Sequence, residues 1–380
     1  MIPELRRRFN ASFTPAKYAD FLSRLETECG TRVAFRNCET PIFLDRGLVD
    51  KMARYGEELI RQLVDDPEYR RRSDASLPAR WAAPNEDEHP VFVQADFGLT
   101  ADLQPKLVEI QGFPSLYAYQ NVLGELHRSA YGLDPGLQFQ MTGDYGQVLR
   151  SALLGARQPH EVALLEIDPY EQKTLADFLV TRRDYGIRIV NIRDVRKDGR
   201  KLIAPDGPIE RIYNRAIVDE LERKNVPLGF DFRDDLEVEW AGHPNWYFRI
   251  SKFSIPYLRH PSVPRTLFLN ELTRIPDDLE NWVLKPLYSF AGLGVSVGPS
   301  REEVERVADP SQYILQERVD FAPLIETPYG PTKAEIRIMY IWTDELRAVT
   351  NIVRMGRGKM MGVDHNKGMD WVGGSVAFWQ

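Results

Sequence analysis

Cysteine, histidine and long apolar runs are scarce in this 380-residue chain. The only cysteines are Cys29 and Cys38, and there are six histidines. Two cysteines cannot build a disulfide framework. The sequence contains neither a CxxC pair nor histidines at the spacing of a metal site. No run of about 18 apolar residues is present, so we expect no transmembrane helix. Residues 1–15 lack the apolar stretch of a secretory signal, and we expect a cytoplasmic location.

An excess of positive charge is also absent. The net charge is −7, which is unlike the basic surfaces that bind nucleic acid or anionic membranes. Hydrophobic residues make up 43% and charged residues 28% of the chain, as in an ordinary globular protein. We therefore expect neither a nucleic-acid nor a membrane partner. The length of 380 residues is sufficient for two or three domains.

A dinucleotide-binding fingerprint is missing where one would be expected. Residues 161–169 contain a Val-, Leu- and Ile-rich run, 173–186 are amphipathic and end at Gly186, and 187–195 form a second apolar run. This order predicts a strand–helix–strand unit with two parallel strands. The segment EIDPYEQ follows the first strand in place of GxGxxG, which argues against an NAD(P) dehydrogenase.

The remaining segments surround this unit. Residues 1–90 have mainly helical spacing, and two short strands follow between 91 and 111. The part after residue 255 is rich in strands, with an antiparallel hairpin turning at Thr343–Asp344 and a loop-like tail. We expect a mixed α+β and α/β protein divided into residues 1–155, 156–255 and 256–380.

Three oxygen-bearing side chains lie in the two early strands, namely Asp96, Glu109 and Gln111. Strand alternation places Glu109 and Gln111 on one face and Ile110 on the other. Carboxylate and amide oxygens are hard ligands that suit magnesium. Taken alone, the two acids are better explained as ordinary surface charges of a hairpin, whereas Gln111 and the loop described next favour metal ligation.

Nearly two hundred residues later, a lysine precedes a glycine-containing segment. Lys285 ends an apolar strand, and Gly292 and Gly294 follow it. Glycines let the backbone approach phosphate oxygens closely, and a lysine supplies a point charge. This pattern indicates a loop that folds over a triphosphate; the alternative for the segment alone is a strand followed by a hairpin.

Two further strands carry polar residues after this loop. The apolar run 313–315 precedes Gln316, Glu317 and Val319, where a linker between two lobes could pair with an adenine edge through its backbone. Glu335 and Arg337 then share one face of a strand, because strand side chains alternate.

Taken together, the order of these motifs resembles the ATP-grasp superfamily. It runs from the lysine and glycine loop through the Gln–Glu hinge and the acid-x-Arg strand to Arg354, Asn366 and the turn at 373–374. In that family an Asp, a Glu thirteen residues later and an Asn two residues after the Glu normally come next and bind magnesium. In this chain Asp96, Glu109 and Gln111 have that spacing upstream instead. The chain therefore resembles a circularly permuted ATP-grasp protein of the glutathionylspermidine synthase-like and carboxylate–amine ligase group.

The resemblance implies a fold and a role for each part of the chain. Residues 1–155 would combine the helical region with the permuted metal-binding segment, 156–255 would be the Rossmann-like pre-ATP-grasp domain, and 256–380 would form the nucleotide-binding lobes. The implied ATP-binding residues are Lys252, Lys285, Gly292, Gly294, Gln316, Glu317 and Val319. The implied catalytic residues are Arg337, Arg354 and Asn366, and the implied metal ligands are Asp96, Glu109 and Gln111. An exposed lysine at a strand end is the alternative for Lys252.

The function implied is that of an ADP-forming ligase that uses ATP and Mg²⁺. It would activate a small-molecule or peptide carboxylate as an acylphosphate and join it to an amine. One alternative is a small-molecule kinase with the same site. A second is a catalytically weak nucleotide-binding protein, suggested by Gln111 where the family usually has Asn. The identities of the acid and the amine, and the oligomeric state, stay open.

Overall fold

The computed structural model describes residues 1–289, 292–358, 361, 366 and 368–380. Its α-helices are α1 (Pro3–Ser12), α2 (Pro15–Cys29), α3 (Arg46–Val64), α4 (Pro67–Arg72), α5 (Tyr117–Tyr131), α6 (Tyr145–Leu154), α7 (Leu175–Tyr185), α8 (Val218–Arg223), α9 (Asn245–Arg249) and α10 (Arg301–Glu305). The first strands are β1 (Ile42–Leu44), β2 (Phe92–Leu99), β3 (Pro105–Gln111), β4 (Val162–Glu166), β5 (Arg188–Asn191), β6 (Arg196–Asp198), β7 (Lys201–Ala204), β8 (Gly207–Ile209) and β9 (Arg211–Asn214). The others are β10 (Glu239–Ala241), β11 (Thr266–Phe268), β12 (Trp282–Pro286), β13 (Ser296–Val297), β14 (Tyr313–Glu317), β15 (Lys333–Trp342), β16 (Leu346–Gly356), β17 (Gly373–Ser375) and β18 (Ala377–Trp379).

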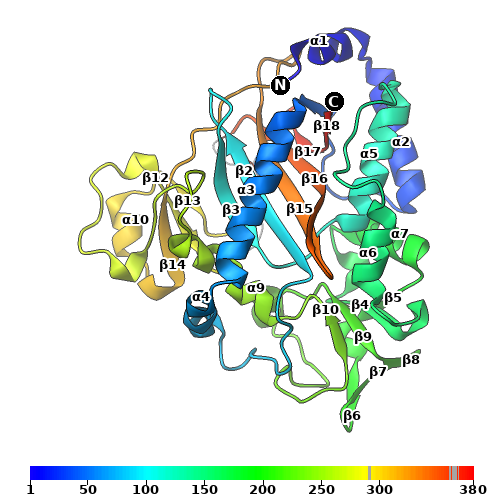
Figure 1. Cartoon of the computed structure of the whole chain (residues 1–380), viewed down its shortest axis with the longest axis vertical. Coiled ribbons are helices and arrows are strands. Elements are labelled where there is room, and N and C mark those ends of the chain that lie inside the picture. Colours follow the sequence, from blue (N-terminus) through cyan, green and yellow to red (C-terminus); the bar gives the residue numbers. More distant parts are fainter. Residues whose placement is uncertain (290–291, 359–360, 362–365, 367) are drawn as a thin grey trace.

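A central antiparallel sheet joins the two ends of the chain. Its strand order is β17-β16-β15-β2-β3. The predicted hairpin is confirmed, since β15 and β16 pair across the turn at 343–345. β2 pairs with β15 in a register that sets Asp96 opposite Arg337. Strands from residues 92–111 and 333–375 thus share one sheet, which lies in the middle of the molecule (Figure 1).

Both faces of this sheet are covered because its apolar residues alternate. Val93 and Ile338 pack into the cluster that contains α3 residues, whereas Phe92 and Met339 pack into the cluster with α5. Figure 1 shows α3 crossing the sheet, with α5 and α6 to one side of it. The side chains of Gln94 and Asp96 continue the face of Phe92, so a polar patch follows the apolar one along β2.

The predicted strand–helix–strand unit is confirmed. β4 and β5 are parallel and joined by α7, which ends at Gly186 with φ of 73°. β9 and β10 extend this sheet on the other side of β4, giving the order β10-β9-β4-β5 with all pairs parallel. A small antiparallel sheet, β6-β7-β8, leads from β5 toward β9.

Another antiparallel sheet holds the segment around Lys285. Its order is β11-β14-β12-β13, and its pairs are antiparallel. Figure 1 shows this sheet beside β3, on the side of the central sheet away from α5. The division of the chain at residues 155 and 255 stays a prediction.

The tail predicted to be loop-like is partly wrong. Residues 373–375 pair with β16, and residues 377–379 pair in parallel with β1. β1 and β18 are more than three hundred residues apart in the sequence. Local spacing could therefore not indicate that they pair. Residues 362–365, which belong to the same predicted tail, lie outside the described residues. In the described part of the chain, no helix combines the length and the apolar character needed to traverse a lipid bilayer.

Gly112, at the end of β3, packs so closely against α9 that a side chain has no space. Gly112 donates its N–H to the carbonyl of Ile250 at 2.7 Å, and a Cβ at Gly112 would stand 2.7 Å from the carbonyl oxygen of Trp246. We expect Gly112→Ala to lower the free energy of unfolding by about 1–3 kcal/mol, because the backbone of α9 must shift. Urea unfolding measures this change.

The matched control is Gly146→Ala in α6, where an added Cβ meets nothing within 4 Å. Alanine is the better helix former, so this variant should be as stable as wild type or slightly more stable. A Gly112→Ala variant that unfolds at the wild-type urea concentration would contradict the close approach.

Candidate functional site

A buried salt bridge between β2 and β15 forms the centre of the polar patch. Arg337 donates from Nε to Oδ1 of Asp96 at 2.6 Å and from Nη2 to Oδ2 at 2.7 Å. Asp96 is 1% exposed and Arg337 7%. Burial alone would raise the pKa of Asp96, but Arg337 and Arg354 outweigh it and hold that pKa below its ordinary value. The pair is therefore ionised at neutral pH and has two parallel hydrogen bonds.

Arg337 also links the two early strands through their amides. Nη1 donates to Oε1 of Gln94 at 2.7 Å. With its amide oriented so that the oxygen faces Arg337, Gln111 accepts from Nη2 at 2.6 Å and from Nη1 at 3.0 Å. The structure thus brings Asp96 and Gln111, two of the predicted magnesium ligands, around one guanidinium.

Glu109 lies beside this group but has a different partner. It is opposite Asp96 in the register of β2 and β3, at an irregularity where the pairing shifts by one residue. Its Oε1 accepts from Nζ of Lys252 at 3.1 Å, and its side chain is 25% exposed. Glu109 is the one predicted carboxylate ligand whose ion pair is with a lysine rather than with an arginine.

Lys252 is buried, so the alternative of an exposed lysine at a strand end is wrong. It begins a short 3₁₀ helix, Lys252–Tyr257, directly after α9, and is 5% exposed. Besides Glu109, its Nζ donates to the carbonyl of Ser289 at 2.7 Å. The lysine therefore connects β3 to the segment that follows β12.

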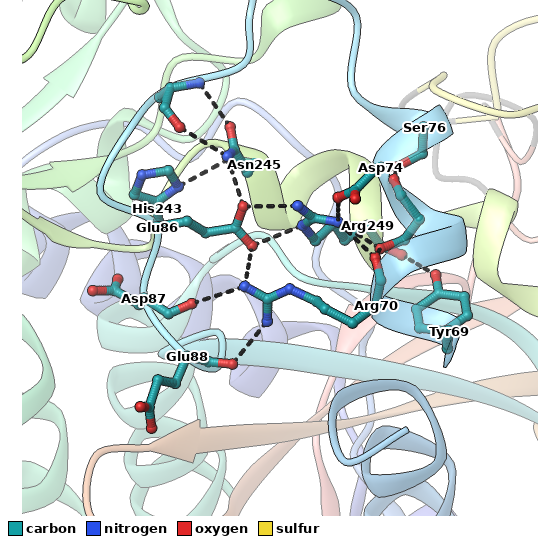
Figure 2. A network of polar contacts seen from close by, with 12 residues as sticks. Tyr69, Arg70, Asp74, Ser76, Glu86, Asp87, Glu88, His243, Asn245 and Arg249 are labelled. Carbon is teal, nitrogen blue, oxygen red and sulfur yellow. Dashed lines mark hydrogen bonds and ion pairs between the residues drawn. The ribbon is translucent and has the colours of Figure 1, made fainter. Parts of the chain in front are cut away.

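An ion-pair network fixes the element that carries Lys252. In α9, Arg249 donates to both oxygens of Glu86, at 2.7 and 3.0 Å, and Arg70 donates to the same carboxylate at 2.7 Å. Asn245 adds a further bond to Glu86 at 2.7 Å. Figure 2 shows these side chains converging from α4 and α9 on Glu86, which lies in the segment before β2. Because the network is partly buried and its members are paired, it restricts the position of α9 and of the lysine after it.

Lys285 reaches the same region from β12, in the sheet β11-β14-β12-β13. Its Nζ donates to the carbonyl of Val108 in β3 at 2.9 Å and to Oε1 of Gln316 at 2.5 Å. Burial lowers the pKa of Lys285 to about 8. The predicted meeting of the early acidic strands with the late lysine is therefore present in the structure.

Arg354 completes the charged group from β16. It donates to Oδ2 of Asp96 at 3.1 Å and forms an ion pair with Glu335. Burial raises the pKa of Glu335, although Arg354 opposes the rise. Four cationic side chains (Lys252, Lys285, Arg337 and Arg354) thus accompany three acidic ones (Asp96, Glu109 and Glu335), which leaves at least one net positive charge.

A small cavity lies next to these charges. Its free volume is about 10 Å³, room for roughly one water. Its lining comes from β3, α9, the 3₁₀ helix and the segment 287–289, and includes Glu109, Gln111, Phe113, Tyr247, Lys252 and Ser289. Tyr247 donates to the carbonyl of Tyr288 at 3.0 Å, so two hydrogen bonds hold segment 287–289 against the cavity.

The other predicted nucleotide-binding and catalytic residues differ in secondary structure and in burial. Gln316 and Glu317 lie within β14, and pair with β11 and β12 rather than forming a free linker. Gln316 is buried and contacts Lys285, whereas Glu317 is exposed and Val319 half-buried. Gly294, with φ of 73°, needs the conformational freedom that the sequence suggested, and Gly292 has φ of 76°. Asn366 accepts from the backbone N–H of Arg357 at 3.0 Å and of Gly358 at 3.3 Å, just after β16.

Sequence reasoning missed several members of the site. Gln94 lies two residues before Asp96 and therefore shares its strand face, which was a usable signal. Tyr247 and the carbonyl of Ser289 had no such signal, because their positions depend on how α9 and β12 pack against β3.

The donor set fits magnesium in its chemistry. Asp96, Glu109 and Gln111 offer hard oxygens. Oδ2 of Asp96 already accepts from Arg337 and Arg354, whereas Oδ1 accepts from Arg337 alone and keeps one lone pair that a metal could use. Within the described residues no three His, Cys, Asp or Glu side chains form a metal-binding group. A metal here would rely on two carboxylates, one amide and the oxygens of a bound phosphate, as Mg²⁺ sites commonly do.

The comparisons with known proteins concern the fold. No protein-family model and no curated protein sequence matches this chain. A solved structure that does resemble it is that of a glutathione synthetase-like effector from Globodera pallida in its apo form. The TM-score is 0.58, the sequence identity 12%, and 97% of each chain is covered. The chain thus has a mixed α/β fold with several sheets that is similar over its length to a glutathione synthetase-like protein.

The lowered pKa of Lys285 generates a pH prediction. The unfolded lysine has a pKa of about 10.4, so between pH 8 and 10 the folded state holds fewer protons than the unfolded state. Stability must then rise with pH in this window. Below the window both states hold the proton, so the contribution of Lys285 is constant and carries the full penalty of the buried ammonium. From about pH 7.5 to about pH 9.5 we expect wild type to gain about 2 kcal/mol relative to Lys285→Met.

Urea unfolding at both pH values measures this difference, and subtracting the variant removes the contributions of other titrating groups. The matched control is Lys201→Met, which removes an exposed lysine of β7 and should follow the wild-type pH profile. If the free energy of unfolding changed equally with pH in wild type and in Lys285→Met, the lowered pKa of Lys285 would be contradicted.

Proposed function

We propose that this protein is an ATP-grasp ligase, which activates a carboxylate with ATP and joins it to an amine. The observation that carries the proposal is the convergence of Lys252 and Lys285 on β3, beside the buried cluster of Asp96, Arg337 and Arg354. A net positive charge built on rigid strands favours a triphosphate. The fold similarity to a glutathione synthetase-like protein supports the same class of reaction.

In the proposed reaction, an oxygen of the substrate carboxylate attacks the γ-phosphorus of ATP, and the bond from that phosphorus to ADP breaks. The amine nitrogen then attacks the acyl carbon, phosphate leaves, and the nitrogen loses a proton. Arg337 and Arg354 would stabilise the charge of the transferring group, and Lys252 and Lys285 would hold the phosphates. Asn366 would orient the strand end beside Arg354.

Asp96, Glu109 and Gln111 would hold magnesium, which neutralises charge on the β- and γ-phosphates when bound. Glu109 would be the first of these ligands, since its present partner Lys252 is itself a proposed phosphate ligand. Gly292 and Gly294 would cover the phosphates, and Gln316, Glu317 and Val319 would line the nucleotide side. The cavity of about 10 Å³ is too small for a triphosphate. Nucleotide entry would therefore break the bonds of Lys252 and Tyr247 to segment 287–289.

The proposal predicts that Glu109→Ala abolishes nucleotide turnover while the fold stays intact. Glu109 is partly exposed, but its loss leaves the buried ammonium of Lys252 with the carbonyl of Ser289, so we expect a measurable loss of stability without unfolding. The rate should fall by at least about 100-fold, because a proposed metal ligand is lost. ADP release measured with a panel of carboxylates and amines is the assay. Glu125→Ala, which removes an exposed carboxylate on α5, is the matched control and should keep wild-type activity.

The products separate the ligase from its alternatives. Amide formation with ADP release supports the ligase, and a stable phosphorylated substrate without amide would indicate a kinase. ATP binding by calorimetry without turnover on any substrate would indicate a nucleotide-binding protein. Wild-type turnover in Glu109→Ala would remove the magnesium role from that residue.

A further inference from the structure

The parallel sheet contains a buried arginine that has no adequate partner. Arg215 directly follows β9 and is 4% exposed. Among the residues that the structure describes, its buried Nε and Nη1 meet no hydrogen-bond acceptor. The side chain beside it, Asn214, is 3% exposed, and its Oδ1 likewise meets no donor in the described part of the chain. Such orphaned polar atoms are rare inside folded proteins and call for a physical explanation.

The cost of this arrangement is large because a guanidinium stays protonated in proteins. Two aromatic rings offset part of it: the guanidinium carbon is 5.6 Å from the centroid of Phe113 and 5.4 Å from that of Phe178. Such contacts attract a cation. They supply no hydrogen-bond acceptor, however, and burying an unpaired charge with unsatisfied donors costs more than the rings return. The rings therefore leave a deficit.

The neighbouring acids do not remove the deficit. Glu166, at the end of β4, feels the charge of Arg215, yet burial raises its pKa to about 8, so it is mainly protonated at neutral pH. Burial likewise raises the pKa of Asp177, whose Oδ1 accepts from the N–H of Tyr119 at 3.0 Å. Among the residues that the structure describes, neither acid forms an ion pair with Arg215 within 4 Å.

Topology gives an independent reason to expect a ligand at this place. In the order β10-β9-β4-β5, the chain runs from β4 outward to β5 and then returns to the other side of β4 to form β9 and β10. The direction of winding thus reverses between β4 and β9. In open parallel sheets, ligands bind outside the carboxyl ends of the strands at such a reversal. Glu166, Asn214 and Arg215 occupy those ends.

We infer that Arg215 and Asn214 form an anion site at the carboxyl ends of β4 and β9, which takes a carboxylate of the ligase substrate. One guanidinium balances one negative charge, and its planar pair of donors matches the two oxygens of a carboxylate. The site adjoins the proposed reaction centre, because Phe113 contacts Arg215 and also lines the cavity of Glu109 and Lys252. That the carboxylate belongs to the substrate rests on the proposed function; the anion site does not.

The test compares Arg215→Met with Arg211→Met in the full chain. Both arginines lie on the β9 segment, but Arg211 is satisfied by the carbonyls of Ala152 and Leu153 and by Glu239. Removing an uncompensated buried charge should raise the melting temperature of Arg215→Met, whereas Arg211→Met should lower it. Saturating acetate, glycine, L-glutamate or glycylglycine should raise the melting temperature of wild type and Arg211→Met by about 2 °C or more for at least one probe, and leave Arg215→Met unchanged.

Several outcomes would overturn the inference. They are a destabilised or unfolded Arg215→Met, no carboxylate-induced shift in wild type, an equal shift in Arg215→Met, and a larger shift with inorganic phosphate than with any carboxylate. Arg215→Lys keeps the charge without the planar fork, and its carboxylate affinity should fall by about tenfold. The measurements contain no ATP, so a wild-type protein without ADP release would refute the ligase and leave the anion site standing.

Discussion

The pairing of Asp96 with Arg337 is the interaction on which the arrangement of the whole site depends. It joins strands 241 residues apart in sequence and lies in the interior, where a charge left without its partner would cost about 3–5 kcal/mol. The same guanidinium contacts Gln94 and Gln111, so β2, β3 and β15 share a single cationic centre. A register slip of one residue on β2 would turn Asp96 to the opposite, apolar face and break all of these contacts.

The site stores more positive charge than its own acids balance. Lys285 reveals the cost, since burial lowers its pKa and its ammonium depends on a carbonyl and an amide rather than on a carboxylate. Lys252 likewise uses the carbonyl of Ser289 for one of its hydrogen bonds. Carbonyl acceptors can be exchanged for phosphate oxygens without leaving a buried carboxylate unpaired. Such an arrangement is costly for stability and suited to binding a polyanion.

Features that depend on neighbouring residues could be predicted from the sequence, and features that depend on distant segments could not. The strand–helix–strand unit, the hairpin at 343–345 and the alternation of Glu109 and Gln111 follow from local periodicity, and the structure confirms them. Strand β18 and the burial of Lys252 could not be predicted, because they depend on β1 and on the Glu86 network far away in sequence. The adjacency of the early acids and the late lysine came from motif order alone. The roles of those residues stay predictions.

Neither the sequence nor any single contact of Arg215 shows that its charge is unbalanced. In the sequence RIYNRAIV it reads as a polar residue that ends a strand, and nothing marks it as costly. Burial, the absence of acceptors at Nε and Nη1 among the described residues, and the reversal of strand order together show that the fold supports an unbalanced charge there. Phe113 links this arginine to the proposed nucleotide site, because it contacts Arg215 and lines the cavity of Glu109 and Lys252. If both proposals hold, a substrate with two carboxyl groups could bind Arg215 through one of them, and the anchored group would then fix the position of the other.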